Sequence, residues 1–301
     1  MTAPRPDGVS REGRDARLAA WVYVNGAWVA AQEARVPATD RGLLYGWGLF
    51  ETVRVAGGRP VLLKRHLDRL FRSAPVLGLE LPWERAELAT LAAEAVARNG
   101  LAEGALRLTV TAGPGPVPGP GGGPLGLLLA PRPGRPPEAA YARGWRAAVA
   151  SVRRNHLSPL ARVKSLNYLD NLLARREAAA RGADEALLLN AEGEVAEGAT
   201  TNVFFVRRGR LCTPAPECGA LPGVMRERVL EVAAGLLPVE EGRYRLADLA
   251  GAEEAFLTNA VLGVMPLVAV DGRPVGSGRL GPVVRELRRV LEPVTGSAPP
   301  G

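Results

Sequence analysis

The chain has 301 residues, of which 47% are hydrophobic and 23% are charged, a composition typical of globular proteins. This length is sufficient for one large domain or two smaller ones, each with its own core. No apolar run approaches the roughly 20 residues that a membrane span needs, and residues 1–17 are polar, unlike a signal peptide. We therefore expect a cytoplasmic protein with no membrane partner.

The net charge of +7 and the pI near 10.1 raise the question of nucleic-acid binding. However, the arginines are scattered along the chain and aromatic residues make up only 5% of it, so we expect no nucleic-acid partner. The two cysteines, Cys212 and Cys218, have no histidines nearby, which is unlike a zinc site. We expect reduced thiols and no bound metal.

The first part of the chain predicts strands with helices on one side. Residues 1–19 are polar and predict a disordered tail, and we assign residues 20–135 to a small N-terminal domain. The Asn25-Gly26 dipeptide predicts a two-residue hairpin turn within residues 21–29. The other elements predicted here are strands over 50–55, 60–63, 105–111 and 125–130, and helices over 64–74 and 84–98.

The second part follows a proline-rich linker predicted over residues 131–137, and we assign residues 136–301 to a larger domain. Its predicted elements are strands over 145–152, 186–189, 195–206, 255–258 and 267–270, and helices over 168–181, 222–236 and 282–291. Strands and helices mix without strict alternation, so we predict an α+β fold rather than a doubly wound parallel sheet. The sequence contains neither a GxGxxG fingerprint nor a Walker loop.

Lysine is rare in this chain: of the 38 lysines and arginines, only Lys64 and Lys164 are lysine. A position that retains lysine is a candidate for chemistry that guanidinium cannot perform. Arginine stays protonated, whereas lysine can lose its proton and attack a carbonyl. Lys64 stands among charged residues of a polar helix, so we expect it at the surface. Lys164 is our candidate for an imine-forming amine, and a second surface lysine is the alternative.

Other segments could complete a site for a cofactor that carries an aldehyde, a pyridine ring and a phosphate. Such a cofactor needs an amine, a carboxylate at the ring nitrogen, an arginine for the phosphate and free helix-terminal amides. The candidates are Lys164, Glu197, Arg69 and the predicted helix start at Leu221–Met225. None of them is specific alone, because a Glu at a strand end or an Arg on a helix is usually solvated.

Together these segments resemble the fold-type IV pyridoxal-phosphate enzymes, the aminotransferase class IV family. The resemblance extends over about residues 21–291, and its most specific segments are Asp40–Glu51, His66–Leu70, Lys164–Asn167, Glu197–Asn202 and Leu221–Gly223. The family holds branched-chain aminotransferases, D-amino acid aminotransferases and 4-amino-4-deoxychorismate lyases. The resemblance implies a two-domain fold-type IV architecture, pyridoxal 5'-phosphate as the cofactor, and a homodimer.

The resemblance also implies roles for single residues. Lys164 resembles the lysine that forms the imine with the cofactor and acts as the catalytic base. Glu197 resembles the carboxylate that keeps the ring nitrogen protonated, and Arg69 resembles the arginine that binds the phosphate. Tyr168 resembles a tyrosine that hydrogen-bonds the cofactor in the branched-chain enzymes, but it lies one residue nearer the lysine. A core tyrosine is the alternative.

The remaining expected site residues contact the cofactor or the substrate. Those that match the family's phosphate and ring contacts are Leu221, Val224, Met225, Ala260 and Val261. Arg107 matches an arginine that lines the substrate site, with an exposed strand arginine as the alternative. Tyr45 matches a residue that reaches the site of the other subunit in a homodimer.

Two departures from the family pattern indicate which activity is present. Ala260 stands where the aminotransferases carry a threonine, and Thr258-Asn259-Ala260 resembles the segment of aminodeoxychorismate lyases. Residues 109–114 lack the Arg and His with which D-amino acid aminotransferases bind the substrate carboxylate. Arg107 does not discriminate between the activities.

The sequence therefore predicts a lyase that converts 4-amino-4-deoxychorismate into 4-aminobenzoate and pyruvate, a reaction of folate biosynthesis. A class IV aminotransferase that uses a branched-chain or other amino donor is the alternative, because both reactions begin by removing the proton from the amine-bearing carbon. A non-catalytic pyridoxal-phosphate-binding homologue is a third hypothesis.

Overall fold

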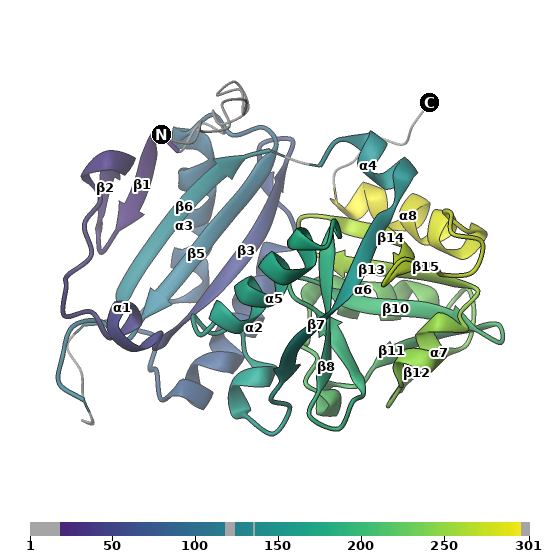
Figure 1. Cartoon of the computed structure of the whole chain (residues 1–301). Coiled ribbons are helices and arrows are strands. Elements are labelled where there is room, and N and C mark those ends of the chain that lie inside the picture. Colours follow the sequence, from purple (N-terminus) through teal and green to yellow (C-terminus); the bar gives the residue numbers. More distant parts are fainter. Residues whose placement is uncertain (1–18, 118–123, 135, 296–301) are drawn as a thin grey trace, which may run out of the picture.

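Two β-sheets with helices on their faces make up the protein in a computed structural model, which describes residues 19–117, 124–134 and 136–295. The sheets lie side by side, and the chain completes the first before it enters the second (Figure 1). This arrangement confirms the predicted α+β fold. The predicted disordered tail lies outside the described residues, apart from residue 19.

The first sheet is antiparallel throughout, in the order β2-β1-β6-β5-β3-β4. Its strands are β1 (Trp21–Val24), β2 (Ala27–Ala30), β3 (Gly48–Ala56), β4 (Arg59–Pro60), β5 (Gly104–Thr111) and β6 (Gly126–Pro133). The predicted turn joins β1 to β2, because Asn25 and Gly26 have φ angles of 48° and 99°. Both values lie in the left-handed region that such a turn requires.

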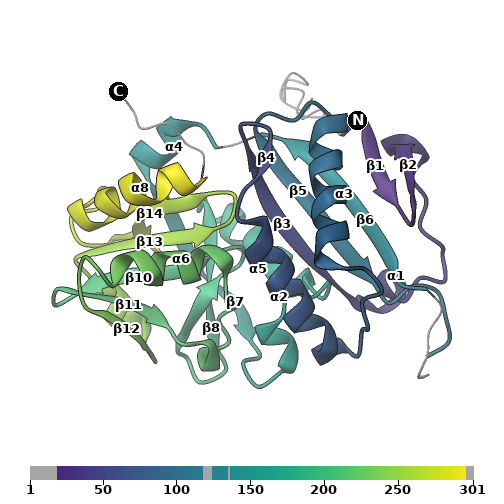
Figure 2. The same ribbon diagram turned by 180° about the vertical axis from the view of Figure 1, so that it is seen from behind.

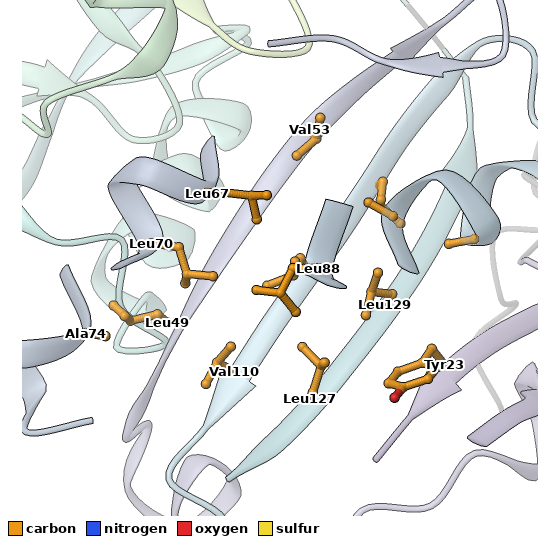
Figure 3. Packing of buried hydrophobic residues seen from close by; sticks show 14 of the residues in the cluster. Tyr23, Leu49, Val53, Leu67, Leu70, Ala74, Leu88, Val110, Leu127 and Leu129 are labelled. Carbon is orange, nitrogen blue, oxygen red and sulfur yellow. The ribbon is translucent and has the colours of Figure 1, made fainter. Parts of the chain in front are cut away.

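Helices α2 (Leu63–Ser73) and α3 (Arg85–Arg98) cover one face of this sheet (Figure 2). Leu67 and Leu70 of α2 and Leu88 of α3 pack there against alternate residues of the strands, such as Leu49 and Val110 (Figure 3). Side chains alternate across a strand, so the residues between them point to the opposite face. That opposite face carries Arg107, one of the two candidate substrate residues.

The second sheet is mixed, in the order β12-β11-β10-β13-β14-β7-β8-β9, with β15 paired to β14. Its strands are β7 (Trp145–Arg154), β8 (Glu185–Asn190), β9 (Val195–Gly198), β10 (Asn202–Arg207), β11 (Arg210–Pro214), β12 (Val239–Gly242), β13 (Glu254–Asn259), β14 (Gly263–Val270) and β15 (Arg273–Pro274). The parallel pairs are β7 with β8, β7 with β14, and β11 with β12.

Helix α5 (Leu169–Ala180) packs against β7 and β8, whereas α6 (Val224–Ala233) and α8 (Pro282–Thr295) pack on each other and on β13. The shorter helices are α1 (Arg41–Tyr45), α4 (Glu138–Arg143) and α7 (Leu246–Ala250), together with 3-10 turns at Ala31–Glu33, Ala74–Leu77, Pro159–Arg162 and Pro216–Cys218. Within the described ranges, no helix is both long enough and apolar enough to cross a bilayer.

Several element boundaries differ from the prediction. Helix α6 begins at Val224 with Gly223 as its N-cap, so Pro222 precedes the helix. The strand predicted over 60–63 ends at Pro60, because Leu62 has a φ of 53° and α2 begins directly after it. Part of the predicted linker belongs to β6, which continues to Pro133.

The prediction also missed or merged elements. The strand expected over 195–206 is broken into β9 and β10, because residues 199–201 turn around the carboxylate of Glu185, which accepts hydrogen bonds from Thr200. Strands β11 and β12 were not predicted, and they pair in parallel with α6 between them. Such pairing depends on contacts between distant segments that periodicity does not reveal.

Candidate active site

The segment that carries Lys164 extends the first sheet at the edge of β3. The backbone N–H of Phe50 donates to the Lys164 carbonyl at 2.9 Å, and that of Leu166 donates to Gly48 at 2.9 Å. β4 covers the same edge of β3 further along, at Val55 and Ala56. Lys164 therefore lies where the two sheets meet.

The Lys164 amine lies over aromatic rings, and the residue is partly buried. Its Nζ is 4.3 Å from the centre of the Phe50 ring and 5.4 Å from that of Tyr168. Burial, together with the charge of Arg69, lowers the pKa of the Lys164 amine to about 8. A neutral amine is the nucleophile that attacks an aldehyde. Lys64, by contrast, is 89% exposed and pairs with Asp68 at 2.9 Å, which confirms it as a surface lysine.

Glu197 is a buried carboxylate at the end of β9. It accepts a hydrogen bond from the Leu221 amide at 2.8 Å and forms an ion pair with Arg154 at 3.1 Å. Burial raises the pKa of Glu197, and the charge of Arg154 opposes that rise. Arg154, which no sequence pattern indicated, provides the cation that favours an ionised Glu197.

Arg69 is held by a second buried carboxylate. Glu51 accepts hydrogen bonds from Arg69 Nε at 2.8 Å and Nη2 at 2.6 Å, and His66 Nδ1 lies 2.6 Å from the same carboxylate. Burial by itself would raise the pKa of Glu51, but the charge of Arg69 and the hydrogen bond from His66 lower it to about 2. Glu51 thus stays ionised and fixes the guanidinium of Arg69.

The third guanidinium contact joins Arg69 to the start of α6. Arg69 Nη1 donates to the Pro222 carbonyl at 3.0 Å, directly before the N-cap Gly223. The first amides of a helix have no acceptor within it and favour an anion. A Cβ on Gly223 would lie 2.1 Å from Asn202 Oδ1, so a larger residue there would require Asn202 to shift. The arginine and the amides of Val224 and Met225 together suit a phosphate group.

The turn after β13 lies against the loop that follows Glu197. Asn259 donates to the Thr200 carbonyl at 3.1 Å, and its Oδ1 accepts from the amides of Val261 at 3.0 Å and Leu262 at 2.8 Å. The Val261 amide is therefore engaged within the turn. Ala260 brings no hydroxyl to this position, unlike a threonine.

Tyr168 and Leu221 are each held by a hydrogen bond to the segment that begins at Glu197. The Tyr168 hydroxyl donates to the Ala199 carbonyl at 2.8 Å, and its ring meets Phe50 edge to face at 5.3 Å. Burial raises the pKa of Tyr168, so the phenol remains protonated. Leu221 is tied to Glu197 by its N–H and to Asn202 by its carbonyl.

The two predicted substrate residues differ in placement. The Arg107 guanidinium lies 3.8 Å from the centre of the Phe50 ring, the ring that Lys164 also contacts, and its Nε donates to Thr109 at 3.2 Å. Tyr45, at the end of α1, is 56% exposed. The described contacts of one chain do not join Tyr45 to Lys164.

A cavity of about 770 Å³ adjoins this region and is lined in part by Arg69, Val163 and Pro222. His156 also lines it; the ring is buried, and its Nε2 lies 3.4 Å from the Glu192 carboxylate. The hydrogen bonds of Glu197 to Leu221 and of Arg69 to Pro222 join this carboxylate and this arginine to consecutive residues before α6, and the charges of both act on the Lys164 amine. An amine, a carboxylate, an arginine and free helix amides are the donor set that an aldehyde, a pyridine ring and a phosphate require.

Comparisons with known proteins identify the family of the chain. The family model for amino-transferase class IV matches residues 48–270. The chain is 34% identical to the aminodeoxychorismate lyase of Bacillus subtilis, over 85% of this chain and 88% of that protein. It is 33% identical to the branched-chain-amino-acid aminotransferase of Pseudomonas aeruginosa, over 89% of this chain and 90% of that protein.

Among solved structures, a branched-chain amino acid aminotransferase of T.th. with pyridoxamine 5'-phosphate aligns with a TM-score of 0.85 and 35% identity, over 93% of this chain and 96% of that one. The family match and this structure confirm the resemblance and support pyridoxal phosphate as the cofactor. The chain belongs to the class IV aminotransferase family of pyridoxal-phosphate enzymes.

Proposed function

We propose that this protein is a lyase that converts 4-amino-4-deoxychorismate into 4-aminobenzoate and pyruvate. The observation that carries the proposal is Ala260, which stands where the family's aminotransferases carry a threonine. Asn259 organises the surrounding turn through its own amide contacts. The similarity to the Bacillus subtilis lyase supports the same proposal.

The residues of the site suit pyridoxal 5'-phosphate. Lys164 would hold its aldehyde carbon, Glu197 its ring nitrogen, and Arg69 with the amides of Val224 and Met225 its phosphate. Leu221 would pack against the ring, with Tyr168 and the 259–261 turn at its periphery. When bound, the cofactor supplies an electron-withdrawing ring that makes the carbon bearing the substrate amine acidic.

Lys164 is the group that moves protons in this proposal. Its pKa of about 8 lets the released amine act as a base near neutral pH. The amine takes the proton from the amine-bearing ring carbon, and the bond from the ring to the enolpyruvyl oxygen then breaks. The six-membered ring becomes aromatic as 4-aminobenzoate, and the enol gains a proton to become pyruvate. Aromatisation favours the elimination.

An aminotransferase is the second candidate, and the branched-chain enzymes among the similar proteins favour it. Removal of the first proton would be common to both reactions. They differ in the next step, because an aminotransferase returns the proton to the cofactor side and releases a 2-oxoacid. Lys164, Glu197 and Arg69 would serve either reaction. The two activities must therefore be distinguished by identifying the reaction products.

Incubation of the cofactor-loaded protein with 4-amino-4-deoxychorismate, without any 2-oxoacid, tests the proposal. We expect 4-aminobenzoate and pyruvate in equal amounts, and neither product with Lys164→Ala. Transfer of the amino group from leucine to 2-oxoglutarate, without lyase activity, would support the aminotransferase instead. Cofactor binding without either reaction would support a non-catalytic homologue.

We also propose that the protein is a homodimer that pairs through α1. Leu43, Leu44 and Tyr45 are consecutive and are 65%, 53% and 56% exposed, which leaves a contiguous apolar surface for a partner to cover. Light scattering should give twice the chain mass. Leu43→Glu with Leu44→Glu should give monomers, and a monomeric native protein would contradict the proposal.

A further inference from the structure

The open face of the first sheet carries two arginines on neighbouring strands. Arg107 of β5 pairs in register with Ala130 of β6, and Arg132 of β6 pairs with Ala105 of β5. Arg132 is two residues beyond Ala130, so the two arginines point to the same face and are diagonal neighbours. Diagonal neighbours across an antiparallel pair lie about 7–8 Å apart, within reach of long side chains.

Among the described residues, these two guanidinium groups have no acidic partner. Within residues 19–117, 124–134 and 136–295, neither Arg107 nor Arg132 forms an ion pair, whereas Arg54 on the same face pairs with Glu103 at 3.6 Å. Burial and then the charge of Arg132 lower the pKa of Arg107. Two like charges near each other without a carboxylate form a surface that an anionic ligand would stabilise.

Of the two arginines, Arg107 lies near the Lys164 amine. Arg107 and Lys164 contact the same Phe50 ring, at 3.8 and 4.3 Å from its centre. Phe50 pairs with Thr109, and Arg107 is two residues from Thr109 along β5. Arg132 pairs with Ala105, which is two residues further in the same direction, so Arg132 lies further from the Phe50 ring than Arg107 does. A substrate whose amine meets Lys164 would therefore extend over Arg107 towards Arg132.

We propose that Arg132 is a specificity-determining residue that binds one carboxylate of a substrate that carries two, while Arg107 binds the other. This inference rests on the proposed function, since 4-amino-4-deoxychorismate has a ring carboxylate and an enolpyruvyl carboxylate. Guanidinium can bind each carboxylate through two parallel hydrogen bonds. A substrate with a single carboxylate would leave one of the two arginines unpaired.

Ligand binding to the cofactor-loaded protein tests this role without turnover. The probes are chorismate, which has both carboxylates but a hydroxyl in place of the amine, and 4-hydroxybenzoate, which has one carboxylate. We expect Arg132→Gln to weaken chorismate binding about tenfold or more in calorimetry, with little change for 4-hydroxybenzoate. Arg132→Lys should restore part of the loss. Arg59→Gln, which removes an exposed charge from the same sheet, should change neither.

The outcomes separate this inference from the lyase proposal. If the native protein makes 4-aminobenzoate and Arg132→Gln binds chorismate normally, or loses both probes equally, the role of Arg132 is wrong. If the native protein neither makes 4-aminobenzoate nor binds chorismate, the lyase proposal fails. In that case, binding of glutarate, which has two carboxylates, is compared with binding of pentanoate, which has one. A selective loss of glutarate binding in Arg132→Gln supports the role of the arginine pair, and any other result overturns it.

Discussion

The Glu51 carboxylate binds Arg69 through two nitrogen atoms, at 2.8 Å from Nε and 2.6 Å from Nη2. β3 supplies Glu51 to the covered face of the first sheet and Phe50 to the open face. One strand thus fixes the candidate phosphate arginine on one side and supports the Lys164 amine on the other. The positions of Arg69 and of the Lys164 amine therefore depend on two adjacent residues, Glu51 and Phe50.

Glu51→Gln should weaken cofactor binding. The substitution removes the charge that orients Arg69 and leaves the buried guanidinium with a neutral partner, so we expect the Kd for pyridoxal 5'-phosphate to rise about tenfold or more. Equilibrium titration followed by absorbance measures this. Glu286→Gln is the matched control, because Glu286 lies on α8 and pairs with the exposed Arg289 at 2.6 Å. Equal affinities for the two variants would contradict the role of Glu51.

The rate at which cofactor-free protein binds pyridoxal 5'-phosphate should depend on the protonation of Lys164. The folded pKa of about 8 lies below the ordinary value near 10.4, so the neutral amine is lost as the pH falls through about 8. The rate should therefore rise with pH up to about 8 and then level off. Stopped-flow absorbance tests this, with Nα-acetyllysine as a reference that continues to rise towards about 10.4. A protein profile that matches the reference would count against the buried amine.

Glu197→Gln should leave the cofactor bound but slow turnover by a factor of about 100 or more, because a neutral amide cannot stabilise a protonated ring nitrogen. The formation of 4-aminobenzoate under saturating substrate measures this. Glu94→Gln removes a partly exposed carboxylate that pairs with Arg98 on α3, and it should retain activity. Full activity in Glu197→Gln would remove the proposed role of this carboxylate.

Gly223→Ala should lower cofactor affinity without changing Lys164. The new Cβ would lie 2.1 Å from Asn202 Oδ1, and Asn202 must then shift away from the Leu221 carbonyl that it binds at 2.8 Å. We expect about a tenfold rise in the Kd for pyridoxal 5'-phosphate, since such overpacking costs about 1–3 kcal/mol. Gly235→Ala is the control, because its nearest atom is the Val232 carbonyl oxygen at 3.7 Å. If Gly223→Ala binds pyridoxal 5'-phosphate with native affinity, Asn202 can move without disturbing the cofactor site and the prediction is wrong.

Short sequence patterns predicted the elements that depend on the conformation of neighbouring residues. The Asn25-Gly26 turn is correct because positive φ angles at two adjacent positions select these residues. The position of Lys164 on the edge of β3 has no such local cause, since its backbone partner Phe50 is far away in the sequence. The chemical needs of an aldehyde cofactor and then the family resemblance, rather than periodicity, linked Lys164, Glu197 and Arg69 in the prediction.

The residue pattern of β3 contains a signal that could have identified Glu51. Leu49, Glu51, Val53 and Val55 occupy alternate positions, and the three apolar members lie in the core. A carboxylate in such a row predicts a buried partner, because an unpaired charge there is very unfavourable. The contact between Arg154 and Glu197 had no comparable signal, since it depends on how β7 and β9 flank β8.

Covalent attachment of the cofactor to Lys164 is the central prediction for this protein. Borohydride reduction of the cofactor-loaded protein, followed by digestion and mass spectrometry, locates the modified lysine. We predict a phosphopyridoxyl group on the peptide that contains Lys164 and none on the peptide that contains Lys64. A label on Lys64, or no label in protein that carries its cofactor, would contradict the assignment.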